Sequence, residues 1–439
     1  MTGLAVGGYF YNGLQRWDLG LDSPNKAAAI LALALIPLLA AILRTRRTWL
    51  AWCCAAASSV IGGVLAHTFS RGGLAALLVG GATLLAGESK RLRAGRKWLP
   101  ILAVAAAITA ATFCLGFSRR IASSAPGADG SVGNRLALWR AVPCMMADAP
   151  GGWGHGSSGD AFMCWYQPLS RHERYRTLVN SHFTWLAEFG WPGRFALICG
   201  WMLVLGLCAT RLKERGDALP LSVWLAFGTA AFFSSVAEDP FVWAIPATSL
   251  LLCRTVRLRI CGIAVAAGAL LTATFALCGH LLPMDGPPVR RTFDGSRVIL
   301  GSGEPTDWIV FDGKTMGGNT YGRALRAFAM SPEGSGRCFC VAADLSCVPR
   351  TVRRLALCGR SADGGPAILD QFRELDEVRV LSPSRPTAWL GSGDGRRRPA
   401  MRIICGDLSP HCPADDVQGL TAVPGAGEYL PGWPELAFR

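Results

Sequence analysis

The sequence predicts a mainly α-helical integral membrane protein with about eight transmembrane helices, followed by a C-terminal soluble α/β domain. Three observations support this fold class. Of the 439 residues, 51% are hydrophobic and only 17% are charged, whereas a soluble globular chain carries about 25% charge. Long apolar runs recur up to about residue 282. Beyond that point the apolar runs become short and alternate with glycine-rich turns, as they do in domains built from short strands.

The long apolar runs divide the chain into a membrane part and its flanking parts. Several of them reach the ~20 residues needed to cross ~30 Å of hydrocarbon. The eight runs cover residues 26–43, 49–69, 73–87, 98–118, 193–210, 219–237, 241–253 and 260–282. We therefore expect an N-terminal segment at 1–25 and a polytopic membrane domain at 26–284, with a long outer loop at 119–180. A soluble domain is expected at 285–439.

Basic residues between the runs predict the orientation. They gather in the loops after the first, third, fifth and seventh runs, namely Arg44, Arg46, Arg47, Lys90, Arg91, Arg93, Arg96, Lys97, Arg211, Lys213, Arg215, Arg254, Arg257 and Arg259. The positive-inside rule places these loops in the cytoplasm, so the 119–180 loop and the 285–439 domain face outward. This distribution explains most of the net charge of +14, and no nucleic-acid partner is expected. Residues 1–25 would also lie outside without a signal peptide. Either the first run inserts with its N-terminus outside or the chain is N-terminally shortened, and we favour the second.

The soluble domain is expected to be a small α/β domain with a partly parallel sheet. Its short apolar runs lie at 308–311, 338–343, 355–358, 378–381 and 401–405, beside helix-like stretches such as 366–375. Six cysteines lie in this domain: Cys338, Cys340, Cys347, Cys358, Cys405 and Cys412. They form no CxxC pair, which argues against a zinc site. Their even number suits disulfides if the domain faces an oxidising compartment.

The first candidate site is the segment Ser70-Arg71-Gly72-Gly73, at the outer end of the second and third runs. The guanidinium of Arg71 keeps its charge at any physiological pH, and its forked donors suit a phosphate or diphosphate oxygen. The structural alternative is an interfacial arginine that extends to the lipid headgroups.

Two segments of the outer loop form the second candidate. Apolar residues recur at helical spacing over 133–142, which predicts a short amphipathic helix with Arg135 near its start. An ordinary surface helix has the same pattern. Residues 150–156 read Pro-Gly-Gly-Trp-Gly-His-Gly, and so many glycines allow the backbone to approach a ligand closely.

The third candidate is the segment 180–193. Asn180 or Ser181 is expected to cap a short helix, and Gly190 is expected to end it. His182 lies inside this helix and is able to act as a base near neutral pH. The structural alternative is a histidine that only forms a stabilising hydrogen bond.

In this order, the three candidates resemble the motifs of the O-antigen ligase / O-antigen polymerase family of polytopic membrane glycosyltransferases. The resemblance covers about residues 22–210. It begins with Asp22-Ser23-Pro24-Asn25, which is similar to the family's Pro-Asn segment before a span, and continues with the Ser-Arg-Gly motif. The segments 134–139 and 150–154 look like its Arg…Trp…Pro…Gly-x-Gly stretch. The segment 180–193 looks like its His-Asn-x-x-Leu…Glu-x-Gly-x-x-Gly signature.

The chain departs from the family's pattern in two ways. Val179 stands where the family's histidine precedes the asparagine, and the nearest histidine is His182, three residues further on. Three residues are close to one helical turn, so the two positions share a face of the helix. His182 is therefore expected to supply the same imidazole, displaced by about 4.5 Å along the helix axis from the position of the family's histidine. About eight spans are also fewer than the ten to twelve typical of the family, which agrees with a shortened N-terminus.

The resemblance implies transfer of a glycan from an undecaprenyl-diphosphate carrier to an acceptor hydroxyl, at the periplasmic face of the inner membrane. The acceptor would be a glycan or lipid A-core, in a ligation or polymerisation reaction. Arg71 and Arg135 would bind the diphosphate and His182 would take the hydroxyl proton, in one inverting displacement without a metal ion or cofactor. Further substrate contacts are expected from Arg140, Gly152, Gly154, Asn180 and Glu188.

Other functions stay open at this point. A polysaccharide transporter or flippase also has many spans, although it would bury charges near the midplane of the membrane. In the tail, residues 355–365 half-resemble a nucleophile elbow, with Asp407 and His411 downstream, which leaves a hydrolase open. A further alternative is an inactive relative whose C-terminal domain binds a glycan or a partner.

Overall fold

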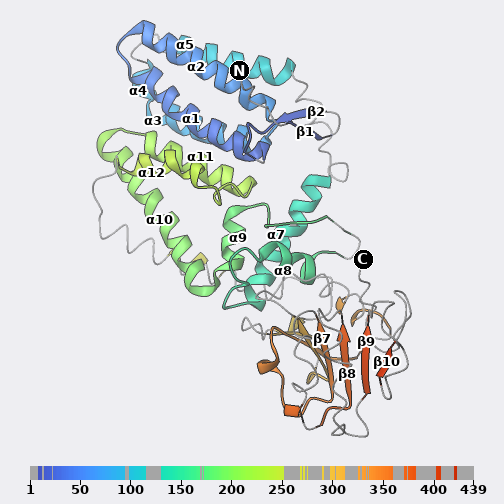
Figure 1. The fold of residues 1–439 in the computed structure, drawn as a ribbon. Helices are drawn as coiled ribbons and strands as arrows, with labels where there is room; N and C mark the ends of the chain where they lie inside the picture. The colour runs from blue at the N-terminus through green and yellow to red at the C-terminus, as the bar shows by residue number, and fades with distance from the viewer. Residues whose placement is uncertain are drawn as a thin grey trace. The chain divides into compact units, whose positions relative to one another are not determined.

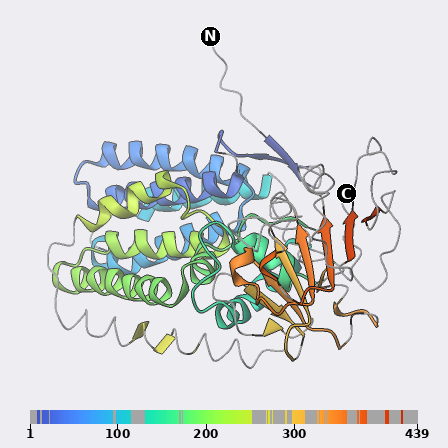
Figure 2. The ribbon, with the colours of Figure 1, turned by 60° about the horizontal axis from the view of Figure 1, so that its bottom comes forward.

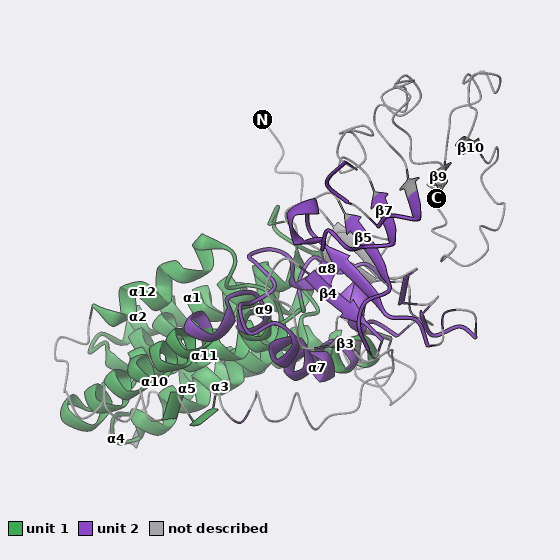
Figure 3. Cartoon of the chain, turned by 90° about the horizontal axis from the view of Figure 1, so that it is seen from below, with its two compact units in different colours: residues 1–136, 178–185, 194–273 green, residues 137–177, 186–193, 274–439 purple. Residues whose placement is uncertain are grey.

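The computed structural model describes most of the chain up to residue 251 and the strands that follow it. The described residues are 8–11, 14–21, 23–93, 98–114, 130–168, 171, 173–251, 267–268, 270–271, 274, 289–290, 297–301, 303–311, 325–326, 329–332, 334, 336–358, 370–372, 374–381, 402–406 and 420–422. They divide into two compact units (Figure 3). Unit 1 comprises residues 1–136, 178–185 and 194–273, and unit 2 comprises residues 137–177, 186–193 and 274–439.

Unit 1 is a bundle of apolar helices. Its main members are α1 (Pro24–Arg44), α2 (Thr48–His67), α3 (Arg71–Gly87), α5 (Trp98–Cys114), most of α10 (Gly190–Arg215) and α11 (Leu219–Phe233). The shorter elements are β1 (Gly8–Tyr11), β2 (Leu14–Trp17), α4 (Ser89–Arg93), the 3₁₀ helix η2 (Pro240–Trp243) and α12 (Ala244–Leu250). Helix α1 packs against α2 and α3, α3 packs against α11, and α2 packs against α5. Figures 1 and 2 both show these helices side by side.

Glycines allow two of these helices to pack at close range. Gly73, Gly80 and Gly87 occupy every seventh position of α3 and therefore share one face. A Cβ atom on Gly80 would lie 2.8 Å from Ala226 Cβ and 2.9 Å from the Ser222 carbonyl oxygen, both on α11. No side chain fits in that space, so α3 and α11 meet backbone to backbone, as small residues allow in membrane helices.

The described helices include candidate membrane spans and shorter apolar helices. Among the described residues, α1, α2 and α10 are long and apolar enough to cross a membrane, while α3, α5, α11 and the segment 240–250 are shorter apolar helices. Each of the first seven predicted runs lies on an apolar helix. The prediction of about eight transmembrane helices is nevertheless not confirmed. The confirmed part is a mostly helical protein with three candidate spans and a mixed C-terminal sheet. The eighth run, 260–282, lies almost wholly outside the described residues.

A network of charged side chains joins the ends of α1 and α3 to the loop between α10 and α11. Glu88 is only 2% exposed, and its carboxylate accepts a hydrogen bond from Arg44 Nε at 3.0 Å and pairs with Arg91 Nη1 at 3.0 Å. Arg44 also pairs with Asp217, which lies 3.4 Å from Arg211 Nε. The pairing compensates the burial of the Glu88 charge, which would otherwise be costly. All the arginines of this network come from loops whose basic character predicts a cytoplasmic location.

Unit 2 contains an eight-stranded mixed sheet in the order β10-β9-β8-β7-β5-β6-β4-β3. The strands are β3 (Val289–Arg290), β4 (Arg297–Leu300), β5 (Asp307–Phe311), β6 (Phe339–Ala342), β7 (Arg354–Cys358), β8 (Glu377–Leu381), β9 (Arg402–Gly406) and β10 (Leu420–Ala422). Strands β5 to β10 pair in parallel, and β4 joins β6 and β3 in antiparallel pairs. This pairing confirms the predicted partly parallel sheet. Each short apolar run also lies on a strand, as expected. Such runs are continuous because strands of parallel sheets are buried on both faces.

Two cysteines of the sheet contribute to its core. Cys338 and Cys340 belong to the buried core of unit 2, where a thiol acts as a small hydrophobic group. Cys347 follows in the short 3₁₀ helix η3 (Leu345–Cys347), and no disulfide joins these three residues to one another. The side chains of the other three tail cysteines lie outside the described residues.

The remainder of unit 2 comes from the outer loop and its surroundings. It holds most of α7 (Gly130–Asp148), then α8 (Ser158–Ala161), the π-helical turn η1 (Phe162–Tyr166) and the end of α9 (Ser181–Glu188). Arg326 is only 1% exposed and donates a hydrogen bond to the carbonyl oxygen of Gln167. Within this unit, the chain beyond residue 274 therefore contacts the segment 137–177.

Candidate functional site

The N-terminal ends of α1 and α3 meet at Ser70. Its Oγ atom caps α3, because it accepts a hydrogen bond from the Gly73 backbone N–H at 3.2 Å. The same hydroxyl donates to Asn25 Oδ1 at 3.0 Å. Asn25 lies in the first turn of α1, where its own backbone N–H donates to the cap residue Ser23. The structure therefore joins the Pro-Asn segment to the Ser-Arg-Gly segment, across 45 residues of sequence.

The chain enters α3 through a strained residue. Phe69 has a φ of 50°, a left-handed conformation that a bulky residue rarely adopts. It persists because the surroundings hold it: Phe69 is 3% exposed, and Thr68 Oγ1 accepts a hydrogen bond from the Ser70 backbone N–H at 3.2 Å. Such strain gathers at functional sites. It positions Arg71, which is the first residue of α3.

The two arginines expected to bind a diphosphate both lie in unit 1. Arg71 stands at the N-terminal end of α3, where the helix dipole already favours an anion. Arg135 lies in the second turn of α7, which confirms the helix predicted at 133–142. Both side chains are partly exposed, so neither guanidinium is sealed in the core. Arg140 follows on the same helix and is exposed.

Helix α9 begins at a second strained position. Val179 has a φ of 54°, and the next residue caps the helix, because Asn180 Oδ1 accepts a hydrogen bond from the Phe183 backbone N–H at 3.1 Å. This confirms the predicted cap. Asn180 is fully buried, and its Nδ2 atom has no hydrogen-bond acceptor in the described part of the chain. Ser181 Oγ accepts from the Ala237 N–H at 3.0 Å, which ties α9 to the chain after α11.

His182 lies against α11. Its Nε2 atom is 3.2 Å from the carbonyl oxygen of Gly228, and its ring meets the Trp201 ring edge to face at 5.1 Å. A carbonyl oxygen only accepts, so Nε2 carries the hydrogen and the lone pair is on Nδ1. Desolvation lowers the pKa of His182 below its usual value, although the hydrogen bond to Gly228 opposes this. The ring is therefore neutral at pH 7.

The glycine-rich loop at 150–156 lies across the end of α9 within unit 2. The Trp153 N–H donates to the Ala187 carbonyl at 3.1 Å, and the Gly154 N–H donates to the Glu188 carbonyl at 3.2 Å. Gly152 and Gly154 have φ values of 84° and 93°, which suit glycine. A Cβ atom on Gly152 would collide with the Glu188 carbonyl oxygen. Glycine at 152 therefore serves a tight backbone contact.

The Glu188 side chain is held at the same place. It is 3% exposed, and its Oε1 atom accepts hydrogen bonds from Ser158 Oγ at 2.6 Å and from the Ser158 N–H at 3.3 Å. Its Oε2 atom lies 3.4 Å from His155 Nδ1. Burial and the two hydrogen bonds from Ser158 make this an oriented carboxylate rather than a surface charge.

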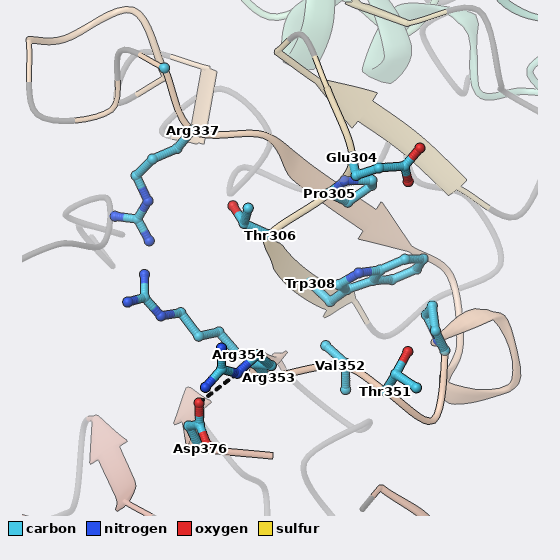
Figure 4. A pocket seen from close by; sticks show the side chains of 12 residues that line it. Glu304, Pro305, Thr306, Trp308, Arg337, Thr351, Val352, Arg353, Arg354 and Asp376 are labelled. Carbon is cyan, nitrogen blue, oxygen red and sulfur yellow. Dashed lines mark hydrogen bonds and ion pairs between the residues drawn. The ribbon is translucent and has the colours of Figure 1, made fainter. Parts of the chain in front are cut away.

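The sheet carries a separate cavity of about 790 Å³ at the edge where β5 and β7 begin (Figure 4). Asp307, the first residue of β5, is fully buried and contacts two arginines that line the cavity. Its carboxylate accepts a hydrogen bond from Arg337 Nε at 2.9 Å and lies 3.7 Å from Arg354 Nη1. Arg353 pairs with Asp376 at 2.9 Å on the rim. No sequence motif marks this cavity; its only signal is the charged residue that begins each of the two strands.

The predicted site residues divide between the units. Unit 1 holds Arg71, Arg135, Asn180 and His182, and unit 2 holds Arg140, Gly152, Gly154 and Glu188. The sequence did not indicate His155 or Ser158 as site residues. Both contact Glu188, which lies 33 residues after His155 and 30 residues after Ser158. The elbow-like segment at 359–365, Asp407 and His411 lie outside the described residues.

Comparison with known families gives a match in the middle of the chain. Residues 56–198 match the family model of the O-antigen ligases. The match spans the Ser-Arg-Gly segment, α7, the glycine-rich loop and the segment 180–193, so the resemblance seen in the sequence is confirmed over these residues. The Pro-Asn segment at 22–25 lies outside the match. No curated protein matches the chain.

Proposed function

We propose, from the match of residues 56–198 to the family model of the O-antigen ligases, that the chain transfers a glycan from a polyprenyl-diphosphate carrier to an acceptor hydroxyl. The family implies a membrane glycosyltransferase-like activity. The observation that carries the finer proposal is the placement of Arg71, at the strained and capped start of α3, inside the matched domain.

Two arginines supply what the leaving group of such a donor requires. A lipid diphosphate carries several negative charges, and more charge develops on it as the glycosidic bond breaks. Arg71 and Arg135 provide two permanent positive charges in unit 1. Their charge-assisted hydrogen bonds would stabilise the developing charge. The positive N-terminal end of α3 adds to the field around Arg71.

The outer surface of unit 1 supports a membrane setting for the lipid part of the donor. Large apolar side chains are exposed on several helices, including Trp49, Trp52, Val60, Leu78, Leu102 and Phe113. A soluble protein rarely exposes so many on one unit. In a bilayer these side chains would contact acyl chains, and a polyprenyl tail would share the same environment.

We propose that the transfer takes place on the periplasmic face of the inner membrane, to a glycan or lipid A-core acceptor, as a ligation or a polymerisation. The support comes from the two ends of α3. Its C-terminal end is followed by Glu88, which pairs with Arg44 and Arg91 from loops of predicted cytoplasmic location. Arg71 begins the opposite end of the helix, and would therefore face the periplasm.

The acceptor hydroxyl must lose its proton during the displacement, which we propose to be a single inverting step. The sequence predicts His182 as the base. Its neutral ring suits a base, but Gly228 occupies Nε2, so only Nδ1 is left to take a proton. The proposed reaction class is the same whichever histidine of the chain acts as the base.

The test is a transfer assay with the full-length protein in lipid nanodiscs, a polyprenyl-diphosphate-linked glycan and a glycan acceptor. Arg71→Gln and Arg135→Gln should each lower transfer by about 10²–10³-fold, the loss expected for a donor to developing charge. The matched control is Arg46→Gln, because Arg46 is exposed between α1 and α2; it should transfer normally. Normal transfer by Arg71→Gln or Arg135→Gln would remove that arginine from the mechanism.

A further inference from the structure

His155 and Glu188 form a pair of contrasting exposure within unit 2. His155 Nδ1 lies 3.4 Å from Glu188 Oε2, and the histidine side chain is 79% exposed while the glutamate side chain is 2% exposed. A buried carboxylate next to an accessible imidazole is the arrangement in which the carboxylate orients the ring and the ring reacts. The distance is slightly longer than a hydrogen bond, as is common in catalytic pairs without substrate.

The carboxylate is fixed independently of the histidine. Ser158 donates twice to Glu188 Oε1, from its hydroxyl at 2.6 Å and from its backbone N–H at 3.3 Å. The backbone of Glu188 is fixed as well, since its carbonyl oxygen accepts the Gly154 N–H at 3.2 Å. Oε2 is therefore left to face the imidazole in a set direction.

The pair defines which ring nitrogen is reactive. A carboxylate only accepts hydrogen bonds, so the hydrogen of the neutral ring belongs on Nδ1 and the lone pair on Nε2. The ring of His155 also stacks on the ring of Phe189, at 5.8 Å between centroids and 13° between planes. This contact limits rotation of an otherwise exposed side chain. Nε2 has no hydrogen-bond partner in the described part of the chain and is free to take a proton.

Glycines on both sides give the loop the shape that presents this ring. Gly154 and Gly156 have φ values of 93° and 76°, which a residue with a side chain adopts only under strain. Gly152 packs directly against the Glu188 carbonyl. The chain thus turns tightly around His155 and holds it next to the end of α9.

His182 is placed for a different task. Its Nε2 atom is engaged by the backbone of α11 and its ring packs on Trp201. Neither contact involves a carboxylate that would orient the ring for proton transfer. Together with Ser181, which bonds to Ser234 and Ala237, it fastens α9 to α11 and the chain that follows.

We propose that His155, oriented by Glu188, is the base that deprotonates the acceptor hydroxyl. This inference rests on the proposed function. His155 Nε2 takes the hydroxyl proton as the acceptor oxygen forms a bond to the anomeric carbon. The bond from that carbon to the diphosphate oxygen breaks, and its electron pair leaves with the diphosphate. The resulting imidazolium is stabilised by Glu188, and it returns the proton to solvent.

The test compares histidine variants in the nanodisc transfer assay. His155→Ala should lower kcat by about 10²–10⁴-fold with little change in the KM for the lipid-linked donor. His67→Asn is the matched control, because His67 stacks on Trp17 and its replacement leaves the His155 pair intact; it should keep a kcat within about tenfold of the wild type. Because the ring is exposed, imidazole in solution should restore part of the activity of His155→Gly.

Glu188→Gln provides a second variant that separates positioning from folding. Glutamine still accepts from Ser158, but its amide donates to His155 Nδ1, which forces the hydrogen onto Nε2 and removes the base. We expect a loss of about 10²–10⁴-fold, as for the wrong tautomer in a histidine–carboxylate pair. The unfolding temperature should change little, and the loss should not respond to imidazole.

The outcomes distinguish this inference from the function on which it rests. Full activity of His155→Ala, with a large loss in His182→Asn, would overturn the assignment and restore His182 as the base. A folded wild type that transfers no glycan would overturn the proposed function itself, and this inference with it.

Discussion

Ser70 Oγ donates a hydrogen bond to Asn25 Oδ1 at 3.0 Å and so ties the start of α3 to the start of α1. The bond links two segments that both resemble family motifs, and it lies next to Arg71. The same Oγ also caps α3. One hydroxyl therefore both begins the helix and positions the arginine that we propose for donor binding.

Ser70→Ala should destabilise the protein by about 1–2 kcal/mol, because it removes a helix cap and the bond to Asn25. The measurement is the free energy of unfolding of the purified protein in detergent. Ser59→Ala is the matched control, since Ser59 Oγ only donates to the Ala55 carbonyl within α2. It should change stability by less than about 0.5 kcal/mol. Equal effects from the two variants would show that Ser70 is an ordinary helical serine.

Gly80→Ala should push α3 away from α11. The new Cβ would lie 2.8 Å from Ala226 Cβ, and overpacking of this kind costs about 1–3 kcal/mol. Gly81→Ala is the control, because a Cβ there meets nothing within 4 Å, and alanine favours a helix by about 1 kcal/mol over glycine. The two variants should therefore shift the unfolding temperature in opposite directions. A stabilising Gly80→Ala would contradict the close contact of α3 and α11.

Gly152→Ala should impair both folding and transfer, because residue 152 has a φ of 84° and its Cβ would collide with the Glu188 carbonyl oxygen. The adjacent Gly151→Ala serves as control, since its Cβ meets nothing within 4 Å. Measured by unfolding and by the transfer assay, the first variant should be weakened by at least about 1 kcal/mol, and the second should resemble the wild type. If Gly152→Ala is as active and as stable as Gly151→Ala, the glycine-rich loop does not hold Glu188.

Stability should depend on pH through His182. Desolvation lowers the pKa of this histidine in the folded protein. Below the usual histidine pKa of ~6.5, the unfolded chain binds a proton that the folded protein refuses, so the free energy of unfolding falls as the pH falls towards the folded pKa. His182→Asn should lose less stability than the wild type between about pH 7.5 and pH 5.5. An identical loss in both proteins would contradict the burial of the ring.

Local features of the fold were predictable from the sequence because they depend on nearby residues. The strand at 355–358 is a continuous apolar run, and a strand buried on both faces requires one. Asn180 was expected to cap α9 and does so. Gly190 was expected to end that helix, and it follows the last turn with a φ of 65°.

Features that depend on tertiary contacts were not predictable. The positive φ of Phe69 and Val179 contradicts the preferences of both residue types and persists only through the surrounding packing. The pairing of His155 with Glu188 depends on a glycine-rich loop crossing the end of α9. Sequence reasoning favoured His182 because it lies in the segment that resembles the family signature, and its role as base stays a prediction.

The most direct measurement follows both products of the proposed reaction. The purified protein in nanodiscs is incubated with an undecaprenyl-diphosphate-linked glycan and a glycan acceptor, and mass spectrometry quantifies glycosylated acceptor and released undecaprenyl diphosphate. We predict that both appear in a one-to-one ratio, with inversion at the anomeric carbon and a rate that falls about 10²–10³-fold in Arg71→Gln. Release of neither product by folded wild-type protein, or release of undecaprenyl diphosphate without glycosylated acceptor, would contradict glycan transfer.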